Sequence, residues 1–298
     1  MKKIVKSNNN NKSNNKSNNK SNNNKSSNNK SSNNKSNNNK SSNNKSNNNI
    51  KSSNNNKSIN NKLNNKIKKD KDVRNKVILN TETYFPKNVS KNVNLSLLFP
   101  PTNKPENMNK LRITNIGLYS ITKPEDAKWI TNKIIENVKD AKNMVITDAT
   151  SAIGGNTISF ARHFKEVNSI EMNPLHFEML NNNVAVYGFK NVNFYLGDSV
   201  KVLKDLKQDI VFFDPPWGGP NYKLIKHLKL YLSKVPLGKI VNDLLRTDTK
   251  YVVIRVPINF DYNSLLNYLN TETYKIYVTK CWHLIIIENN KNEIRTCH

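Results

Sequence analysis

Short apolar runs alternate with longer, mixed segments from about residue 144 to the end of the chain. The short runs are rich in Val, Ile and Phe and predict strands, whereas the longer segments predict helices. The predicted strands cover residues 144–149, 169–172, 192–198, 209–213, 251–257, 274–280 and 283–288. The predicted helices cover residues 157–164, 174–187, 235–246 and 264–269. This alternation predicts an α/β fold with a mostly parallel sheet and right-handed crossovers.

The last two predicted strands follow each other too closely for a helix to lie between them. Only an antiparallel pair can be joined by so short a connection, so we expect a hairpin at the edge of the sheet. With this pair, the sheet should have seven strands. The expected fold is therefore Rossmann-like, a seven-stranded sheet that ends in an antiparallel hairpin.

Residues 71–140 show a different pattern. Over residues 71–110, apolar islands are separated by prolines, which predicts an irregular arm with one short helix. A longer helix is predicted over residues 124–138, with Thr122 as its N-cap and Glu125 completing a capping box. Its apolar stripe would be buried and comprises Trp129, Ile130, Ile134 and Ile135.

Residues 1–70 are a loose repeat of Asn, Lys and Ser. They hold 17 Lys, one acidic residue and no aromatic residue, and so account for +16 of the formal net charge of +26. Such a tract buries too little apolar surface to offset the entropy of ordering, so we expect a disordered tail. An A/T-rich codon bias is a sufficient origin for the repeat, but its charge still predicts non-specific contacts with nucleic-acid phosphates. The chain thus divides into this tail, an arm over residues 71–140 that contributes to the substrate site, and a main domain over residues 141–298.

Several protein classes fit the composition poorly. No apolar run is long enough to span a bilayer, and the N-terminus lacks the apolar core of a signal peptide. The only cysteines are Cys281, in a predicted strand, and Cys297. We therefore expect an intracellular protein, nuclear or cytoplasmic, that acts as a monomer and has no disulfide, metal site or membrane anchor.

The sequence Asp214-Pro215-Pro216-Trp217 follows the buried strand predicted at 209–213. The two prolines stiffen the chain where the strand ends, and the carboxyl end of a central strand is where α/β sheets bind ligands. This corner resembles motif IV of methyltransferases that act on exocyclic amino groups of bases. The resemblance implies that the Asp214 carboxylate and the Pro215 carbonyl accept hydrogen bonds from such an amino group, favouring charge build-up on its nitrogen. Trp217 would stack on the base and orient it. The alternative is a proline-rich turn with a core tryptophan.

Three acidic residues end consecutive predicted strands, namely Asp148, Glu171 and Asp198. The turn with Gly154-Gly155 after the first strand brings the backbone close to a bound nucleoside. Glu171 suits the two ribose hydroxyls, and Asp198 suits the adenine amino group. A dinucleotide dehydrogenase would share this pattern, but the G-x-G-x-x-G fingerprint is absent. The other alternative is that these acids only cap helices.

Six segments together resemble a known family. They are Ser120-Ile121-Thr122 with Pro124-Glu125, Asp148-Ala149 with Gly154-Gly155-Asn156-Thr157, Ile170-Glu171-Met172-Asn173-Pro174, residues 181–188, Gly197-Asp198, and Pro215-Pro216-Trp217-Gly218-Gly219-Pro220-Asn221-Tyr222. Over about residues 110–260 the chain resembles the trimethylguanosine synthases. This resemblance implies a class I methyltransferase that uses S-adenosylmethionine to methylate N2 of 7-methylguanosine caps on RNA.

The resemblance also implies roles for individual residues. Those implied for S-adenosylmethionine binding are Thr122, Asp148, Ala149, Gly154, Asn156, Thr157, Glu171, Met172, Asp198 and Asp214. Those implied for the catalytic corner are Asp214, Pro215 and Trp217. Those implied for the capped substrate are Trp217, Arg112, Tyr119, Pro220, Asn221, Tyr222 and Asn259.

The chain also departs from the family pattern. Asp214 stands where the family often has Ser, Ala152 replaces a glycine of the cofactor turn, and Leu118 replaces a Trp. The family's Pro-Arg-Asn motif reads Pro-Ile-Asn here, so Ile258 replaces a phosphate-binding arginine, for which Arg255 or a nearby lysine would substitute. Two rivals stay open: an amino-methyltransferase of adenine N6 in DNA or of guanine N2 in structured RNA, and an inactive cap- or RNA-binding module.

Overall fold

The computed structural model of the protein describes residues 3–6, 87–88, 93–269 and 273–289. They belong to one compact unit, which comprises Met1–Asn8 and Lys76–His298. Apart from Lys3–Lys6, the predicted tail lies outside the described residues, as does Cys297. Within the described part of the chain, no helix has the length and apolar character needed to cross a membrane.

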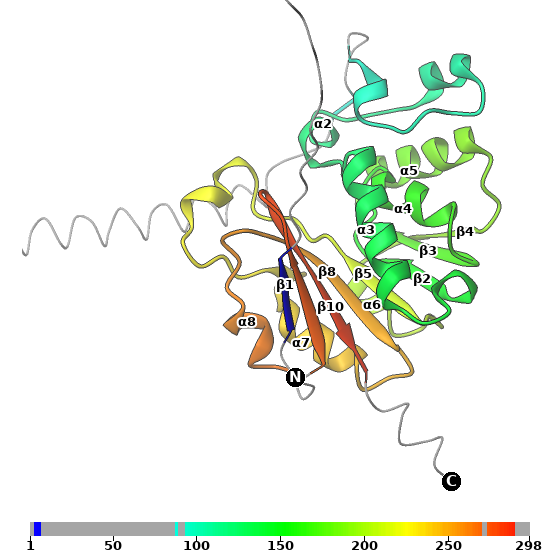
Figure 1. Cartoon of the computed structure of the whole chain (residues 1–298). Coiled ribbons are helices and arrows are strands. Elements are labelled where there is room, and N and C mark those ends of the chain that lie inside the picture. The colour runs from blue at the N-terminus through cyan, green and yellow to red at the C-terminus, as the bar shows by residue number, and fades with distance from the viewer. Residues whose placement is uncertain (1–2, 7–86, 89–92, 270–272, 290–298) are drawn as a thin grey trace, which may run out of the picture. The chain divides into compact units, whose positions relative to one another are not determined.

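One sheet organises this unit, with the strand order β1-β9-β10-β8-β5-β2-β3-β4 (Figure 1). Its strands are β1 (Lys3–Lys6), β2 (Val145–Asp148), β3 (Glu166–Glu171), β4 (Val192–Leu196), β5 (Ile210–Phe213), β8 (Tyr251–Pro257), β9 (Tyr274–Val278) and β10 (Trp282–Glu288). Across the sheet, the neighbouring strands β8, β5, β2, β3 and β4 are parallel to one another. Strand β10 is antiparallel to both β8 and β9. The expected α/β fold with a C-terminal antiparallel hairpin is confirmed.

The eighth strand, β1, lies in the segment predicted to be a disordered tail, so that prediction is wrong for Lys3–Lys6. Lys3–Lys6 pairs in parallel with β9, with Lys3 opposite Lys275 and Lys6 opposite Val278. An edge strand offers a row of unpaired backbone groups, and a short extended segment can satisfy them. The β-branched pair Ile4 and Val5 favours the extended conformation that this pairing needs.

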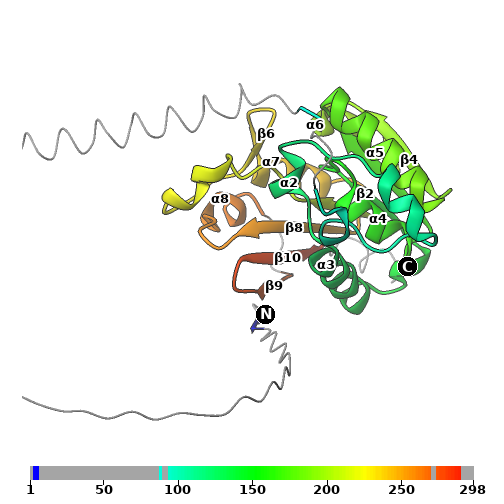
Figure 2. The ribbon, with the colours of Figure 1, turned by 90° about the horizontal axis from the view of Figure 1, so that it is seen from above.

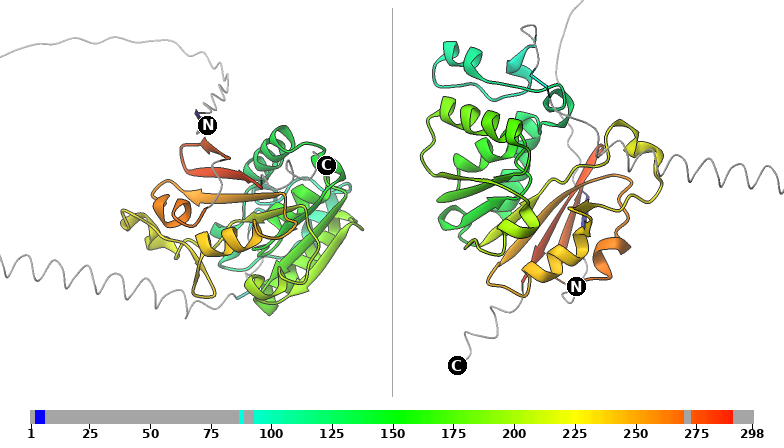
Figure 3. Two further views of the ribbon diagram at one scale, coloured as in Figure 1. Left: turned by 90° about the horizontal axis from the view of Figure 1, so that it is seen from below. Right: turned by 180° about the vertical axis from the view of Figure 1, so that it is seen from behind.

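Helices cover both faces of the sheet (Figures 2 and 3). On one face lie α3 (Pro124–Asn137), α4 (Gly155–Ala161) and α5 (Pro174–Tyr187). On the other lie α6 (Ser199–Val202), α7 (Leu237–Leu244) and α8 (Asn263–Leu266). Successive strand residues face opposite helix layers: Phe212 packs in the cluster with α3 and α4, and Phe213 in the cluster with α7. This is why the central strands are apolar throughout.

The arm packs against α5. It contains two 3-10 helices, η1 (Leu95–Leu97) and η2 (Pro105–Lys110), and then the short helix α2 (Gly117–Ser120). The buried Phe99 shares a hydrophobic cluster with Leu180 of α5. Asn183 of α5 bonds to both the backbone N–H and the backbone carbonyl of Arg112. One short helix was predicted within residues 71–110. The described part of that range has the 3-10 helices η1 and η2, and the short α-helix α2 follows it.

Three local predictions were wrong. The N-cap of α3 is Lys123, without a side-chain cap bond, because the Thr122 hydroxyl bonds to Asp214 and Asn156 instead of to the helix. The helix predicted from residue 235 begins at Leu237, since Tyr231–Leu232 (β6) and Val235–Pro236 (β7) form a small hairpin. Cys281 lies exposed in the turn between β9 and β10, outside any strand.

Candidate active site

The predicted site residues meet where the parallel strands end. Asp148 is the last residue of β2 and Glu171 is the last residue of β3. Asp214 directly follows β5, and its backbone N–H donates to Thr150 Oγ1 at 2.8 Å. That hydrogen bond joins the turn after β2 to the Pro-Pro-Trp corner, so the two predicted halves of the site are neighbours.

The turn after β2 approaches other backbone closely and uses unusual conformations. Ala152 has φ of 46° and Gly154 has φ of 102°, both in the left-handed region. A Cβ on Gly155 would lie 2.8 Å from the carbonyl oxygen of Thr122, so only glycine lets α4 begin this close to the arm. At Ala152, where the family has glycine, the left-handed conformation costs about 1–2 kcal/mol.

Asp148 lies wholly inside the protein, beneath this turn. Its Oδ2 accepts a hydrogen bond from Thr157 Oγ1 at 2.7 Å, and Oδ1 accepts one from the backbone N–H of Thr150 at 3.4 Å. Burial raises the pKa of Asp148 to about 7, and these hydrogen bonds oppose the shift only in part. The side chain thus joins the turn to α4. Ala149, next to it, is also buried and donates its N–H to Phe212.

Glu171 is held by the backbone. Its two carboxylate oxygens accept from the N–H of Ala152 at 2.9 Å and from the N–H of Asn173 at 2.7 Å. Burial raises the pKa of Glu171, and the backbone hydrogen bonds oppose this effect. Met172, the next residue, is largely exposed. A buried carboxylate aimed by two N–H groups is suited to accept further hydrogen bonds from sugar hydroxyls.

Asp198 is the N-cap of α6, and its Oδ1 accepts from the N–H of Val200 at 3.0 Å. The capping interpretation is therefore correct for one oxygen. Among the described residues, the other oxygen has no hydrogen-bond partner, and it can accept from an amino group. The N–H of Gly197 bonds to the carbonyl of Glu171, so the two acids stand side by side at the strand ends.

Asn156, at the start of α4, provides a test of the expected methyl donor. Its amide nitrogen donates to Thr122 Oγ1 at 2.9 Å, but its Oδ1 is a buried acceptor without a partner among the described residues. An ammonium group is a donor that would satisfy it, and S-adenosylmethionine carries one on its amino-acid end. With Glu171 and Asp198 for the ribose and adenine, the residues present fit this cofactor.

At the corner, a buried ion pair holds Asp214. Asp214 Oδ2 accepts from Arg255 Nη1 at 2.7 Å and from Thr122 Oγ1 at 3.1 Å. The two charged side chains are only 11% and 12% exposed. Pro215 is buried, and Gly218 and Gly219 both have positive φ, so the chain turns sharply after the tryptophan.

Trp217 is partly buried and packs against both main core clusters. Its ring lies 5.2 Å from that of Tyr222 in an edge-to-face arrangement, and the Arg255 guanidinium carbon lies 5.1 Å from its centre. The indole N–H is buried and has no partner in the described part of the chain. Trp217 therefore both packs in the core and forms part of the corner.

The segment after the corner is fastened by Asn259. This residue donates to the carbonyl of Tyr222 at 2.9 Å and to that of Ile225 at 2.6 Å. The segment begins with the 3-10 helix η4 (Pro220–Leu224), in which Asn221 is exposed. The structure thus brings Asn259 to the segment that holds Tyr222.

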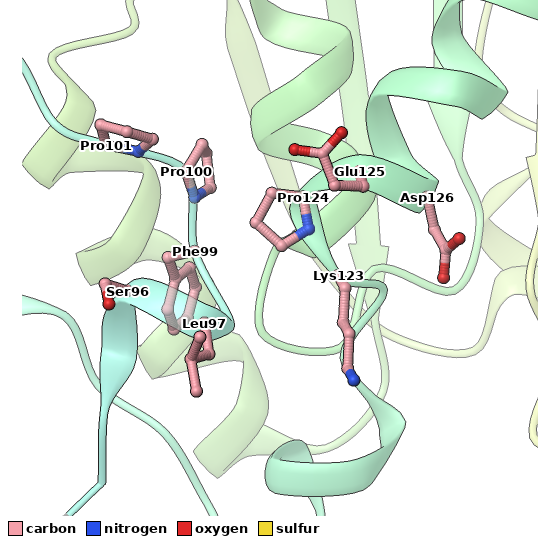
Figure 4. A pocket seen from close by; sticks show the side chains of 9 residues that line it. All are labelled: Ser96, Leu97, Phe99, Pro100, Pro101, Lys123, Pro124, Glu125 and Asp126. Carbon is pink, nitrogen blue, oxygen red and sulfur yellow. The ribbon is translucent and has the colours of Figure 1, made fainter. Parts of the chain in front are cut away.

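The predicted substrate residues Arg112 and Tyr119 lie on the arm. The Arg112 guanidinium bonds to Glu178 of α5 at 2.6 Å, with both side chains more than half exposed. Tyr119 and Leu118, on α2, are both exposed. Beside α2 lies a pocket of about 330 Å³ between the arm and the start of α3 (Figure 4). It is lined by Ser96, Leu97, Phe99, Pro100, Pro101, Lys123, Pro124, Glu125 and Asp126.

Sequence reasoning missed the partner of Asp214. Arg255 was considered only as a phosphate contact, and Thr122 only as a helix cap and a cofactor contact. One signal was visible: Arg255 is the single charged residue in the apolar strand Tyr251–Pro257. A charge in a strand that is buried on both faces requires a buried partner of opposite charge.

The strand order and the strand-end acids define an S-adenosylmethionine-dependent class I methyltransferase. Residues 143–297 match the family described as RNA cap guanine-N2 methyltransferase. The chain belongs to this family and is an RNA methyltransferase with S-adenosylmethionine as its cofactor.

Other proteins are similar to parts of this chain. Uncharacterized protein L320 of Acanthamoeba polyphaga mimivirus is 33% identical over 216 residues, which cover 64% of this chain and 84% of that protein. The trimethylguanosine synthase of Schizosaccharomyces pombe is 31% identical over 172 residues, covering 54% of this chain and 68% of the yeast protein. Among solved structures, an rRNA methylase from Streptococcus thermophilus has 13% identity and a TM-score of 0.39, with 56% of this chain and 97% of that chain covered.

Proposed function

We propose that the protein transfers a methyl group to the exocyclic N2 of a 7-methylguanosine RNA cap, forming 2,7-dimethyl- or 2,2,7-trimethylguanosine. The observation that carries this proposal is the hydrogen bond between the Asp214 N–H and Thr150. It joins the corner that contains Asp214 and Trp217 to the turn after β2, which supports a base-binding site next to the proposed cofactor site. Membership in the cap methyltransferase family supports the same substrate.

The chain's own residues have distinct tasks in this reaction. S-adenosylmethionine supplies an activated methyl group when it is bound. Asp214 and the Pro215 carbonyl accept hydrogen bonds from the amino group of the base, which stabilises the positive charge that develops on its nitrogen. Trp217 stacks on the base and orients it. Because 7-methylguanine is cationic, its stacking on indole gains about 0.5–2 kcal/mol beyond the stacking of a neutral base.

RNA phosphates need cationic partners, and Arg255 is committed to Asp214. The segment after the corner offers others: Lys223, Lys226 and Lys229 are all exposed, and no acidic residue lies between Trp217 and Asp243. Asn259 fastens this segment beside Ile258, the position where the family has its phosphate-binding arginine. These lysines take over the phosphate contacts, and the lysine-rich N-terminal tail adds non-specific ones.

The second candidate is methylation of another exocyclic amino group, such as adenine N6. The observation that favours it is Asp214, because amino-methylating DNA enzymes have an acidic residue before the Pro-Pro-aromatic sequence, whereas the cap family often has Ser. A neutral adenine would use the same hydrogen-bond acceptors but would lack the additional attraction of a cationic ring for Trp217.

A methylation assay read by mass spectrometry separates these candidates. The substrates are 7-methyl-GTP, GTP, capped RNA and adenine oligonucleotides, with Glu171→Ala as the cofactor-deficient control. The expected result is methylation of 7-methyl-GTP and capped RNA, with GTP a poor substrate, and the product mass shows whether one or two methyl groups are added. Methylation confined to adenine oligonucleotides would overturn the proposal in favour of the second candidate.

A further inference from the structure

We propose that Arg255 is a positioning residue that holds Asp214 and Trp217 in their working geometry and weakens the preference of the corner for a cationic base. This inference rests on the proposed function and deepens it. Arg255 contacts Asp214 and Trp217, and it acts through these two residues, which meet the base.

Arg255 joins three segments that are far apart in the sequence. Its Nη1 donates to Asp214 Oδ2 at 2.7 Å and lies 3.3 Å from Thr122 Oγ1. Its Nη2 lies 3.8 Å from Asp126, which lines the pocket at the start of α3. A planar guanidinium with several fixed donors is the side chain best able to hold such partners together. Arg255 thereby ties the arm and α3 to the catalytic corner.

The guanidinium also lies between two indoles. Its carbon is 5.1 Å from the ring centre of Trp217 and 4.9 Å from that of Trp282, at the start of β10. Trp282 in turn meets Trp129 of α3 edge-to-face at 5.2 Å. All three tryptophans of the chain are therefore linked, Trp217 to Trp282 through Arg255 and Trp282 to Trp129 directly. Because the guanidinium lies over the Trp217 ring, the proposal has the base stack on the opposite face of the indole.

The buried Arg255–Asp214 ion pair is not the most stable way to fill this part of the core. Arg255 Nε and Trp217 Nε1 are both buried donors with no partner among the described residues. At the neighbouring positions on this face, Val253 and Phe212 are apolar and fully buried. Apolar side chains in place of a buried ion pair are often at least as stable, whereas this pair leaves two donors unsatisfied. Such a cluster of exceptions is typical of a functional site.

For Asp214, the consequence is orientation. Both bonds from Arg255 and Thr122 go to Oδ2, and within the described part of the chain Oδ1 has no partner. That oxygen is left to accept the amino N–H of the base. Without Arg255 the carboxylate could turn, so the acceptor would lose its fixed direction and the turnover number would fall.

For the choice of base, the consequence is electrostatic. Asp214 alone would place a negative charge beside the base and would favour the cationic 7-methylguanine over neutral guanine. Arg255 compensates this charge and adds a positive charge beside Trp217, which reduces that advantage. Removing Arg255 should therefore lower the turnover number but raise the preference for the 7-methylated base, two changes that general loss of structure would not combine.

The test compares Arg255→Met, Arg255→Lys, Asp214→Asn and the double variant D214N/R255M with the wild type. Arg162→Met, which removes an exposed arginine outside the site, is the matched control. Turnover numbers and KM values are measured for 7-methyl-GTP and GTP well below the melting temperature, together with cofactor affinity by calorimetry. The indole Nε1–H signal of Trp217, assigned with Trp217→Phe, is followed by NMR.

Arg255→Met should lower the turnover number by about 10- to 100-fold, with cofactor affinity within about twofold of wild type. The ratio of KM for GTP to KM for 7-methyl-GTP should rise by roughly threefold or more. Arg255→Lys should restore part of the turnover number, and the double variant should lose no more than the worse single variant, because the two residues act as one unit. Full multiplication of the two losses, or an unchanged 7-methyl preference, would overturn the proposal.

The indole signal keeps this test separate from the proposed function. If the wild type methylates neither guanine nucleotide, the cap assignment fails, and the Trp217 signal alone decides the role of Arg255. A shifted Trp217 signal in Arg255→Met, with the cofactor still bound and the Arg162→Met spectrum unchanged, supports positioning. An unchanged Trp217 signal would refute it.

Discussion

The two halves of the candidate active site, the turn and acids proposed for the nucleoside and the Pro-Pro-Trp corner proposed for the substrate, are held in place by different kinds of hydrogen bonds. In the half proposed for the nucleoside, backbone N–H groups hold two of the three acids: Glu171 accepts from Ala152 and Asn173, and Asp198 accepts from Val200. The third acid, Asp148, also accepts from the Thr157 side chain. In the substrate half, side chains hold the key residues: Asp214 accepts from Arg255 and Thr122. Backbone donors come with the fold itself, whereas side-chain donors change with a single substitution.

This difference explains where the chain departs from its family. The nucleoside half keeps its acids and changes only a glycine to Ala152, whose N–H still reaches Glu171. The substrate half has Asp214 for Ser and Ile258 for Arg, and its charge is compensated by Arg255 from another strand. A common cofactor requires the first half to stay the same, whereas changes in the second half can adjust which base is accepted. The predictions below test this separation.

The largest effect is expected for Trp217→Ala. Loss of base stacking costs about 1–3 kcal/mol, and the additional attraction to a cationic ring is lost as well. Activity on 7-methyl-GTP should fall by roughly 10- to 1,000-fold, and the 7-methyl preference should shrink, with Trp217→Phe recovering part of both. Kinetics on both nucleotides measure this. If the indole serves only as core packing, the protein would be destabilised with its 7-methyl preference intact.

Glu171→Ala should weaken the binding of S-adenosylmethionine without changing the substrate half of the site. It removes charge-assisted hydrogen bonds worth about 1.5–3 kcal/mol, so calorimetry should show roughly 10- to 150-fold weaker binding of S-adenosylmethionine. Glu178→Ala, an exposed glutamate on α5, is the control and should bind the cofactor normally. Equal affinity in both variants would remove Glu171 from the cofactor site.

Asp148 should make stability depend on pH. Its pKa is about 7 in the folded protein and near 3.8 when unfolded, so the folded state retains a proton that the unfolded state releases. The stabilising contribution of the protonated Asp148 carboxyl is fully present below about pH 4 and is lost as the pH rises through about 7. Between about pH 5 and pH 8, the wild type should lose about 2–3 kcal/mol relative to Asp148→Asn, as measured by urea unfolding. A constant difference between the two proteins would contradict the buried, protonated carboxyl.

The smallest effect is expected for Ala152→Gly. Glycine relieves the left-handed conformation at φ of 46°, although it gains more entropy in the unfolded state, so the net stabilisation should be at most about 1 kcal/mol. The N–H to Glu171 is kept, so cofactor affinity should stay within about twofold. Thermal unfolding and calorimetry check this together. A marked loss of affinity would show that the Cβ of Ala152 itself supports the nucleoside half.

The alternation of apolar and polar residues and the turn residues predicted seven strands of the main sheet, the helices α3 and α5 and the closing hairpin, but not β1, β6 or β7. Their apolar residues must be buried whatever the rest of the chain does, and α5 spans the residues predicted for it, Pro174–Tyr187. The three strand-end acids were also readable, because parallel strands end at one edge. The tertiary structure alone decided which side chains meet there. Thr122 faces Asp214 instead of capping its helix, and Arg255 pairs with an acid 41 positions away. Those contacts depend on the order of the strands and on the face of the sheet that a side chain occupies. The apolar and polar pattern of a short segment determines neither of them.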